Sequence, residues 1–288
     1  MTQPGSSSAP HPLFTPSKPE GVPTRGKTAR NRLRRVDNFL LRYAPELIRR
    51  DDGDYHGALV VDLGYGAEPF TTLEMAHRLR RLNTTLPVLG VEIDPMRVSA
   101  AQPYADQQTH FRLGGFNLPL ESSNQGVESV RAVRAFNVLR QYDEGDVAGA
   151  WSRLGRYVLP GGLLIEGTSD PFGRVWTANL LRRTDTSGEG AWRNEGLIFS
   201  TNFRTGFDLS QFQAVLPKNY IHRMVSGEAI HDFFQAWQRA ADETSAFQAW
   251  GFRQWFVAGI ERLGEGGCPV KLTRRWWRHG YLMIGLEP

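Results

Sequence analysis

The stretch that decides the fold runs Ala58-Leu-Val-Val-Asp62-Leu-Gly64-Tyr-Gly66. Its first part is a short apolar run with two valines, which favours a buried strand over a helix. The two glycines follow at once, and a helical pattern begins at Pro69. A strand that passes through a glycine-rich turn into a helix lets backbone N–H groups come close to a ligand. The stretch therefore predicts a ligand-binding turn at the carboxyl end of a buried strand.

Strand and helix patterns alternate over residues 58–170. Apolar runs predict further strands at 87–93 and 163–166, and we expect another strand at 127–135 and a weaker one at 109–113. Periodic apolar residues predict helices at 69–82, 95–101 and 144–157. This alternation is typical of βαβ units in a parallel, doubly wound sheet. Right-handed crossovers then bring the carboxyl ends of the strands to one edge, where ligands bind. We expect an α/β fold with a mostly parallel, Rossmann-like sheet.

The parts outside this core predict a tail, a basic helix and a helical insertion. Residues 1–27 are dense in Pro, Ser and Gly without a hydrophobic period, so we expect a flexible tail. Residues 28–50 carry one apolar stripe at helical spacing. The substrate side, about 171–279, is less regular and includes an aromatic-rich helical insertion near 227–263. We take 28–288 as one domain.

The composition of the 288 residues is that of an ordinary globular protein. Hydrophobic residues make up 40% and charged residues 22%, so the chain can bury a sizeable core. The single cysteine, Cys268, excludes an internal disulfide and a zinc site built from several thiolates. The histidines show no metal-ligand spacing, so we expect no metal. The sequence has no run apolar enough to cross a bilayer and no secretory pattern at its start, which favours a cytoplasmic protein.

An acidic residue ends the second predicted strand and narrows the ligand class. Glu92 stands where a carboxylate can accept both ribose hydroxyls of an adenosine-containing ligand. Asp62 just before the two glycines strengthens that interpretation. A nicotinamide-dependent oxidoreductase on a similar sheet is an alternative, but Pro69 occupies the third glycine position of its Gly-x-Gly-x-x-Gly pattern.

Four segments resemble the motifs of class I S-adenosylmethionine-dependent methyltransferases, in the order of that family. They are the turn at 61–66, the strand end at 89–95, Phe136-Asn137-Val-Leu139, and Arg153 to Ile165 with its Pro-Gly-Gly turn at 160–162. The resemblance covers about residues 58–170. It implies a seven-stranded sheet, S-adenosylmethionine as cofactor, and transfer of its methyl group to an acceptor that the sequence does not identify.

The resemblance also implies the contacts of the cofactor's amino-acid end. Gly64 and Gly66, with the backbone around Tyr65, would hold that end. Asp62 would orient this loop or contact the ammonium group, directly or through water. Asn137, after the fourth strand, would complete the set.

The adenosine half would lie against the ends of the next two strands. Glu92 would hold the ribose, Ile93 would pack on the adenine, and Phe116 could stack on it. Many family members place an acid after the third strand to bind the adenine amino group. Here Gly115-Phe116-Asn117 stands there, so that contact is missing or comes from Asn117 or the backbone.

A second departure concerns Glu68, which stands where a third glycine is frequent in the family. A carboxylate beside the cofactor carboxylate would repel it, so we expect Glu68 to point away. Together with the missing third-strand acid, this departure supports a second alternative. It is a binding or scaffold protein that keeps the fold and has lost the chemistry.

Methyl transfer requires a nucleophile placed in line with the methyl group, and a base where that nucleophile is protonated. The polar residues at the strand ends are therefore candidates for catalysis, and they are Asn137, Arg140, Tyr142, Glu166 and Asp170. Glu166 or Asp170 could be the base, or could instead cap a helix or pair with Arg174. The sequence singles out none of the candidates.

The segment from Arg25 to Arg50 holds nine basic and two acidic residues. Such a segment could be an RNA-binding arm, the solvated face of a capping helix, or an entrance that recognises a small anionic substrate. No aromatic residue that could stack on bases precedes Phe39, which weakens the RNA interpretation. We expect a small-molecule acceptor, with RNA as the alternative partner.

Overall fold

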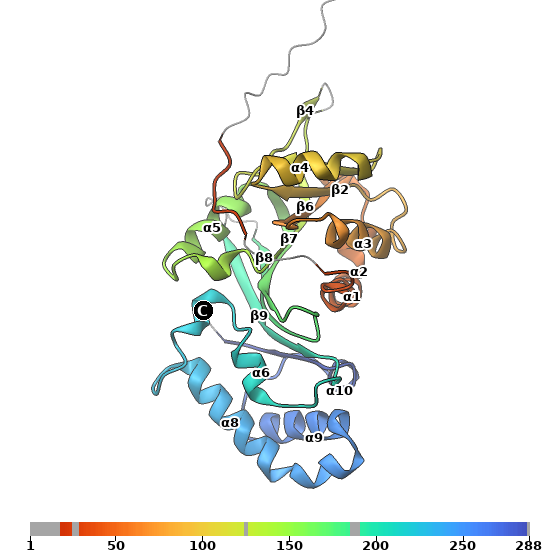
Figure 1. Ribbon diagram of the computed structural model, residues 1–288. Helices are drawn as coiled ribbons and strands as arrows, with labels where there is room; N and C mark the ends of the chain where they lie inside the picture. Colours follow the sequence, from red (N-terminus) through yellow and green to blue (C-terminus); the bar gives the residue numbers. More distant parts are fainter. Residues whose placement is uncertain (1–17, 25–28, 124–125, 185–190, 287–288) are drawn as a thin grey trace, which may run out of the picture.

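An eight-stranded sheet runs through the protein in the computed structural model, which describes residues 18–24, 29–123, 126–184 and 191–286 (Figure 1). Its strand order is β10-β9-β8-β7-β6-β1-β2-β3. The strands are β1 (Leu59–Leu63), β2 (Val88–Glu92), β3 (Thr109–Leu113), β6 (Val130–Phe136), β7 (Val158–Ser169), β8 (Val175–Arg183), β9 (Trp192–Thr201) and β10 (Tyr281–Ile284). Strands β4 (Ser122–Ser123) and β5 (Gly126–Val127) form a separate pair.

The half of the sheet built from β3, β2, β1, β6 and β7 is parallel throughout. Every residue of β1, β2 and β6 is buried, because helices cover both faces of these strands. The alternation of short apolar runs with helices thus predicted the fold class correctly. Because the strands are parallel, the residues that follow β1, β2, β3 and β6 meet along one edge.

The other half of the sheet differs from the seven-stranded expectation. Strands β7, β8, β9 and β10 follow one another in antiparallel pairs, which makes eight strands in all. The sequence did not indicate β8, because the polar residues Thr177 and Asn179 are buried within it and interrupt its apolar pattern. The predicted strand at 163–166 is part of the longer β7, whose bounds also include the Pro-Gly-Gly turn.

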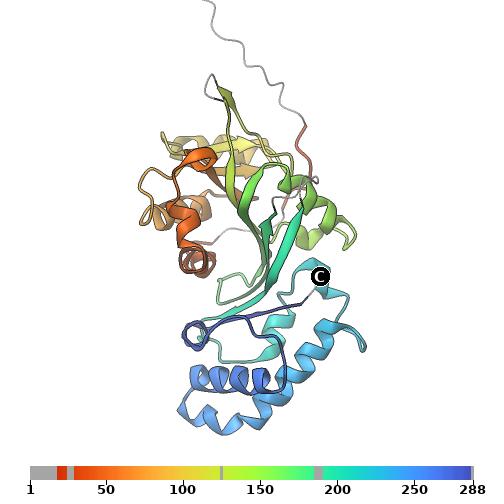
Figure 2. The same cartoon turned by 180° about the vertical axis from the view of Figure 1, so that it is seen from behind.

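Two groups of helices cover the parallel strands. Alternate residues of β1 point to opposite faces: Val60 packs in a core with α1, α2 and α3, and Val61 packs in a core with α5 (Figure 2). Pro45 begins α2, and the first helix ends two residues earlier, at Tyr43. The bounds are α1 (Arg34–Tyr43), α2 (Pro45–Arg49), α3 (Phe70–Leu79), α4 (Pro95–Ala101) and α5 (Asp146–Gly155), with 3-10 helices η1 (Gly53–Tyr55), η2 (Gln102–Tyr104) and η3 (Leu139–Gln141).

The remaining helices form a lobe against the antiparallel strands (Figure 1). The ring of Phe199 on β9 lies 5.2 Å from that of Phe233 and 5.4 Å from that of Trp237. This lobe is the helical insertion predicted near 227–263, although the wider region 171–279 also supplies β8 and β9. Its elements are α6 (Leu209–Gln213), α7 (Lys218–Ile221), α8 (Ala229–Glu243), η4 (Ser245–Trp250), α9 (Phe252–Glu265) and α10 (Arg274–Trp277).

Candidate functional site

The loop after β1 presents bare backbone at the edge of the sheet. Gly64 and Gly66 have φ of +71° and +91°, a conformation that strains any residue with a side chain. A Cβ atom on Gly64 would lie 2.7 Å from Cγ2 of Val138. The side chain of Tyr65 turns away and packs on Phe111, with ring centroids 5.4 Å apart. The loop therefore presents backbone to the crevice at this sheet edge, which is the space lined by Gly64, Glu92, Ile93, Phe116 and Asn137.

Glu92 joins the end of β2 to that glycine loop. Its Oε2 accepts the N–H of Gly66 at 2.9 Å, and its Oε1 accepts the N–H of Ile93 at 3.0 Å. Nη1 of Arg97 lies 3.6 Å from Oε1. The side chain is 1% exposed, and the residue lines the crevice, so the carboxylate is shielded from bulk water.

Asp62 is the centre of a buried network beneath the loop. Its carboxylate accepts the hydroxyls of Thr71 and Thr72 at 3.0 and 2.8 Å and pairs with Arg134 at 2.7 Å. Arg134 also pairs with Asp37 of α1. Burial disfavours the charged guanidinium, but Asp37 and Asp62 outweigh it and raise the pKa of Arg134. Of the two roles expected for Asp62, these contacts favour holding the loop over contacting an ammonium group.

Residues 18–24 lie in the crevice, although the sequence placed them in a flexible tail; the rest of that predicted tail is outside the described residues. Figure 1 shows this segment running past α5, and Glu20 lies 3.5 Å from Arg153 of that helix. Its backbone makes the hydrogen bonds to the crevice wall that a bound ligand would make. The N–H of Phe116 donates to the carbonyl of Glu20 at 2.9 Å. In return the Glu20 N–H donates to Oδ1 of Asn117 at 2.7 Å.

The following residues of the segment are held in the same way. The N–H of Val22 donates to the hydroxyl of Tyr142, and Nε2 of Gln141 donates to the Val22 carbonyl at 3.1 Å. Arg97 donates to the carbonyl and hydroxyl of Thr24 at 3.0 and 3.2 Å. What remains of the crevice is a cavity of about 20 Å³ beside Ile93 and Phe116 and one of about 40 Å³ beside the glycine loop. Each has room for one or two water molecules, so the crevice is closed to a nucleoside.

Asn137 and Arg32 lie at the end of the crevice where the glycine loop meets β6. Asn137 has a φ of +61°, and its Oδ1 accepts the N–H of Ser169 at 3.1 Å. Nε of Arg32 donates to Oγ of Ser169 at 3.0 Å and to the carbonyl of Asp170 at 3.1 Å. Both side chains line the 40 Å³ cavity. The sequence placed Arg32 only within a basic segment, because its position at the site depends on how the residues before α1 pack.

The other expected catalytic residues do not gather at this point. Nη1 of Arg140 donates to the carbonyl of Ala214 at 2.8 Å. Asp170 accepts the backbone N–H groups of Arg174 and Val175 at 2.6 and 3.1 Å, so it holds the turn between β7 and β8. Tyr142 contacts the segment, as described above. Glu68 is exposed and lines neither cavity of the crevice, in agreement with its expected outward orientation.

Glu166 is buried on β7, away from the crevice. Its Oε2 accepts Nδ2 of Asn179 at 2.9 Å, and the same Nδ2 donates to Asn219 at 3.0 Å. Among the described residues, the hydroxyl of nearby Tyr220 has no hydrogen-bond partner. Burial raises the pKa of Glu166 to about 7, although the bond from Asn179 opposes this shift.

This raised pKa predicts a pH-dependent stability. The native state holds the Glu166 proton more tightly than the unfolded state, so stability falls as pH rises from the usual carboxyl value toward 7. Glu166→Gln keeps an acceptor for Asn179 and cannot ionise. We expect denaturant titrations to show about 2 kcal/mol less loss of stability between pH 5 and pH 7 in this variant than in the wild type. The control Glu68→Gln changes an exposed carboxylate, and an unchanged pH profile in Glu166→Gln would contradict the prediction.

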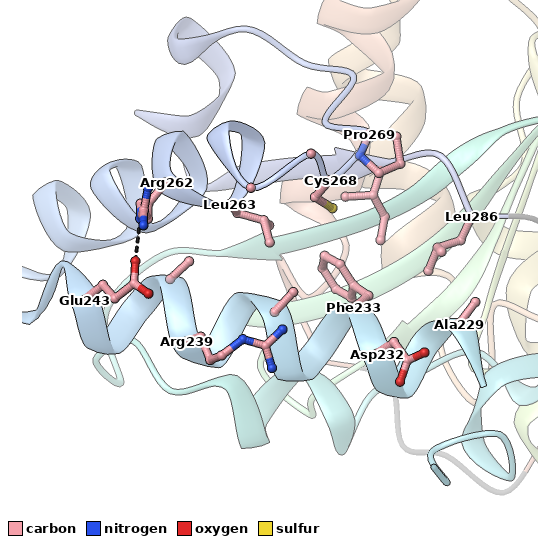
Figure 3. Close-up of a pocket in the computed structure, with 15 residues that line it drawn as sticks. Ala229, Asp232, Phe233, Arg239, Glu243, Arg262, Leu263, Cys268, Pro269 and Leu286 are labelled. Carbon is pink, nitrogen blue, oxygen red and sulfur yellow. Dashed lines mark hydrogen bonds and ion pairs between the residues drawn. The ribbon is translucent and has the colours of Figure 1, made fainter. Parts of the chain in front are cut away.

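A cavity of about 600 Å³ lies in the helical lobe and not at the sheet edge (Figure 3). It lies between α8 and α9, and the ion pair of Arg262 with Glu243 bridges the two helices beside it. Its apolar floor includes Phe233 and Leu263, which are already buried. None of the residues expected from the sequence lines this cavity.

The basic segment does not form a free arm over its described part. The guanidinium of Arg30 lies 3.9 Å from the ring centroid of Phe70. Nε of Arg35 donates to Ser200 at 2.9 Å, and its Nη2 donates to the carbonyl of Gly280 at 3.0 Å. Arg32 and Arg35 thus attach the start of α1 to the sheet, and Arg30 contacts α3. Arg25 and Lys27 lie outside the described residues, and Arg34 and Arg42 are exposed.

Over residues 18–24, 29–123, 126–184 and 191–286, no helix combines the length and apolar character that a membrane crossing requires. The same part of the chain brings no three His, Cys, Asp or Glu side chains together as a metal site.

Comparison with known proteins finds similarity among solved structures only. No family profile matches the chain. No curated protein matches it either. Magnesium protoporphyrin IX methyltransferase from Synechocystis, with S-adenosylhomocysteine bound, is 20% identical over 48% of this chain and 54% of its own, at a TM-score of 0.34.

Two further solved structures are similar over the same share of the chain. The methyltransferase domain of the citrinin polyketide synthase is 17% identical over 49% of this chain and 36% of its own, at a TM-score of 0.37. The plantazolicin methyltransferase, in complex with a substrate analogue and S-adenosylhomocysteine, is 13% identical over 49% of this chain and 46% of its own, at 0.34. The chain thus spans about a third to a half of these proteins.

The topology defines the class of fold. Five parallel strands in the order β3-β2-β1-β6-β7, with a glycine loop after β1 and an acid at the end of β2, form a Rossmann-like, doubly wound α/β sheet. The fold expected from the sequence is therefore confirmed.

Proposed function

We propose that the protein binds S-adenosylmethionine in the crevice at the sheet edge and transfers its methyl group to a small-molecule acceptor. The observation that carries the proposal is the convergence of three elements at one place. The bare backbone of Gly64 and Gly66, the buried carboxylate of Glu92 and the apolar contacts of Ile93 and Phe116 all meet there.

The residues of the crevice suit the parts of this cofactor. The Glu92 carboxylate would accept a ribose hydroxyl at Oε2, which accepts one backbone N–H, whereas Oε1 already accepts those of Ile93 and Asp94. The N–H of Phe116 and Oδ1 of Asn117 would contact the edge of the adenine. The bound cofactor supplies an electrophilic methyl group on its sulfonium, and the protein's contribution is to hold both reactants in line. Asn137 lies where the acceptor would approach.

If the acceptor needs a base, Tyr142 is the candidate from the sequence that could supply it. Glu166 and Asp170 are occupied elsewhere in the fold. The Tyr142 hydroxyl faces the crevice, where it now accepts the N–H of Val22. An acceptor that is already deprotonated or carries a free lone pair would need no base.

The filled crevice favours one other candidate function, a scaffold that has lost cofactor binding. Calorimetric titration of the full chain with S-adenosylhomocysteine and with NADH distinguishes the alternatives. We expect a heat signal with S-adenosylhomocysteine and none with NADH. Binding of NADH alone would identify an oxidoreductase, and binding of neither, also after the crevice is opened as described below, would favour the scaffold. Incubation with labelled cofactor and cell extract then shows whether label enters small molecules, RNA or protein.

Arg32 is the residue that we expect to recognise the cofactor's carboxylate. It lines the cavity beside the glycine loop, and charge-assisted hydrogen bonds contribute about 1.5–3 kcal/mol. Arg32→Ala should therefore weaken S-adenosylhomocysteine binding roughly tenfold or more. Binding of 5′-methylthioadenosine, which lacks the carboxylate, should not change. If both ligands lose affinity equally in calorimetry, Arg32 acts only by supporting Ser169 and Asp170.

A further inference from the structure

We propose that residues 18–24 are an internal ligand, bound where the adenosyl group is expected, and that cofactor binding requires their release. This inference rests on the function proposed above, because it concerns the adenosine side of the same crevice. Five backbone or side-chain groups of the wall bind the segment: Phe116, Asn117, Tyr142, Gln141 and Arg97.

The backbone N–H and carbonyl of residue Glu20 offer the same pair of hydrogen bonds as one edge of adenine. Its carbonyl accepts the Phe116 N–H at 2.9 Å, and its N–H donates to Oδ1 of Asn117 at 2.7 Å. Adenine presents a ring-nitrogen acceptor beside an amino donor, so the same donor and acceptor on the protein can form hydrogen bonds with either Glu20 or adenine. Asn117, which stands near the position where many family members have an acid, can therefore accept a hydrogen bond from the segment or from the adenine base.

Gly21 occupies the space in which the base would pack. A Cβ atom built on Gly21 would lie 2.8 Å from the Tyr142 hydroxyl, 3.4 Å from Cδ1 of Ile93 and 3.8 Å from Cε2 of Phe116. Its φ of +143° is one that residues with side chains rarely adopt. Only a bare, flat peptide therefore fits against Ile93 and Phe116 at this point. A nucleoside and Gly21 cannot occupy the crevice together.

The contacts of the segment are of a kind that a ligand can replace. Every second residue, at positions 18, 20, 22 and 24, binds the wall through its backbone. The side chain of Val22 remains 53% exposed, so the segment buries little apolar surface. Exchange of such hydrogen bonds with water costs little net free energy, which makes the segment a local unit that can open while the sheet stays folded.

This arrangement has a quantitative consequence for cofactor affinity. When only a fraction of the molecules has an open crevice, the apparent dissociation constant equals the intrinsic one divided by that fraction. A variant that weakens the docked segment without touching the wall should therefore bind S-adenosylhomocysteine more tightly than the wild type. A variant of a wall residue cannot show this, since the wall is common to both ligands.

Gly21→Val is the variant that tests the inference. It places a branched side chain against Tyr142 and Ile93 and strains the backbone, so the segment should leave the crevice. We expect at least tenfold tighter S-adenosylhomocysteine binding in calorimetry, and the same direction with adenosine alone. Val22→Pro, which removes the N–H that donates to Tyr142, should act in the same direction. The matched control is Gly227→Val, where φ is also positive at +93° and a Cβ meets nothing within 4 Å.

Hydrogen exchange measures the segment without any ligand and separates this inference from the proposed function. In the wild type, the amides of Glu20, Val22 and Phe116 should be protected, and they should lose protection in Gly21→Val. Saturating S-adenosylhomocysteine should deprotect Glu20 and Val22 in the wild type. Unprotected amides in the wild type, or equal affinity in the wild type and Gly21→Val, would overturn the inference.

A different result would overturn the proposed function. If neither protein binds S-adenosylhomocysteine or adenosine although exchange shows the segment released in Gly21→Val, the crevice is not a cofactor site. In that case the segment does not compete with a cofactor. Protection of its amides in the wild type would still establish that the segment docks in the crevice.

Discussion

Arg134→Met is expected to lower the free energy of unfolding by about 3–5 kcal/mol. Arg134 is fully buried in β6 and pairs with two carboxylates, Asp37 and Asp62, which are themselves almost completely buried. Removal of the guanidinium leaves the Asp62 carboxylate in the interior without a cationic partner, and Asp37 keeps only its ion pair with Arg78 at 2.8 Å. The cost of the unpaired buried charge exceeds the loss of the ion pairs themselves. Urea titration of the two proteins at pH 7 measures the difference.

The control for this prediction is Arg81→Met, which changes an exposed arginine just after α3. Its effect should remain within about 0.5 kcal/mol. Adding Asp62→Asn to Arg134→Met should recover part of the stability, since it removes the carboxylate that has lost its ion pair, whereas Asp37 keeps Arg78. Equal stability of Arg134→Met and Arg81→Met would show that the network does not stabilise the fold.

Glu92→Ala should weaken S-adenosylhomocysteine binding by about 2–3 kcal/mol, or roughly 30- to 150-fold, because ribose hydrogen bonds to a charged group are lost. The effect includes a contribution from the glycine loop, since Glu92 also accepts the N–H of Gly66. Calorimetry in the Gly21→Val background measures this effect without competition from residues 18–24.

Asp94→Ala is the matched control for Glu92. Asp94 lies two residues further along the chain, where its carboxylate caps α4 by accepting the Met96 N–H at 2.9 Å, and it does not line the crevice. Its loss should lower stability slightly and leave cofactor affinity unchanged. Unchanged binding in a folded Glu92→Ala protein would mean that the ribose partner is misassigned.

The sequence predicted those parts of the fold in which side-chain pattern and backbone structure agree. Strands β1 and β2 are buried on both faces and begin as short apolar runs, and the helix before Pro45 carries a single apolar stripe. β8 escaped prediction because buried Thr177 and Asn179 resemble the polar residues of a loop. Arg134 gave no signal either, since its partners come from distant parts of the chain.

Two features of the candidate site could not be predicted, for different physical reasons. The place of Arg32 depends on how the residues before α1 pack on the turn after β7, which local pattern does not encode. The docking of residues 18–24 uses mostly backbone N–H and carbonyl groups, and every sequence supplies these. A composition rich in Pro, Ser and Gly therefore indicates a tail without excluding a bound one.

The connection between the docked segment and the first helix has a consequence for inhibition. Only residues 25–33 separate Thr24 from α1, and α1 packs on α3. A ligand attached through so short a tether meets its site at an effective concentration in the millimolar range. A synthetic peptide copying residues 18–24 would compete poorly in solution, although the attached copy competes well. A weak intrinsic affinity for the crevice is thus enough for the covalently attached segment. The concentration of the cofactor would then set the fraction of molecules in which the segment is displaced.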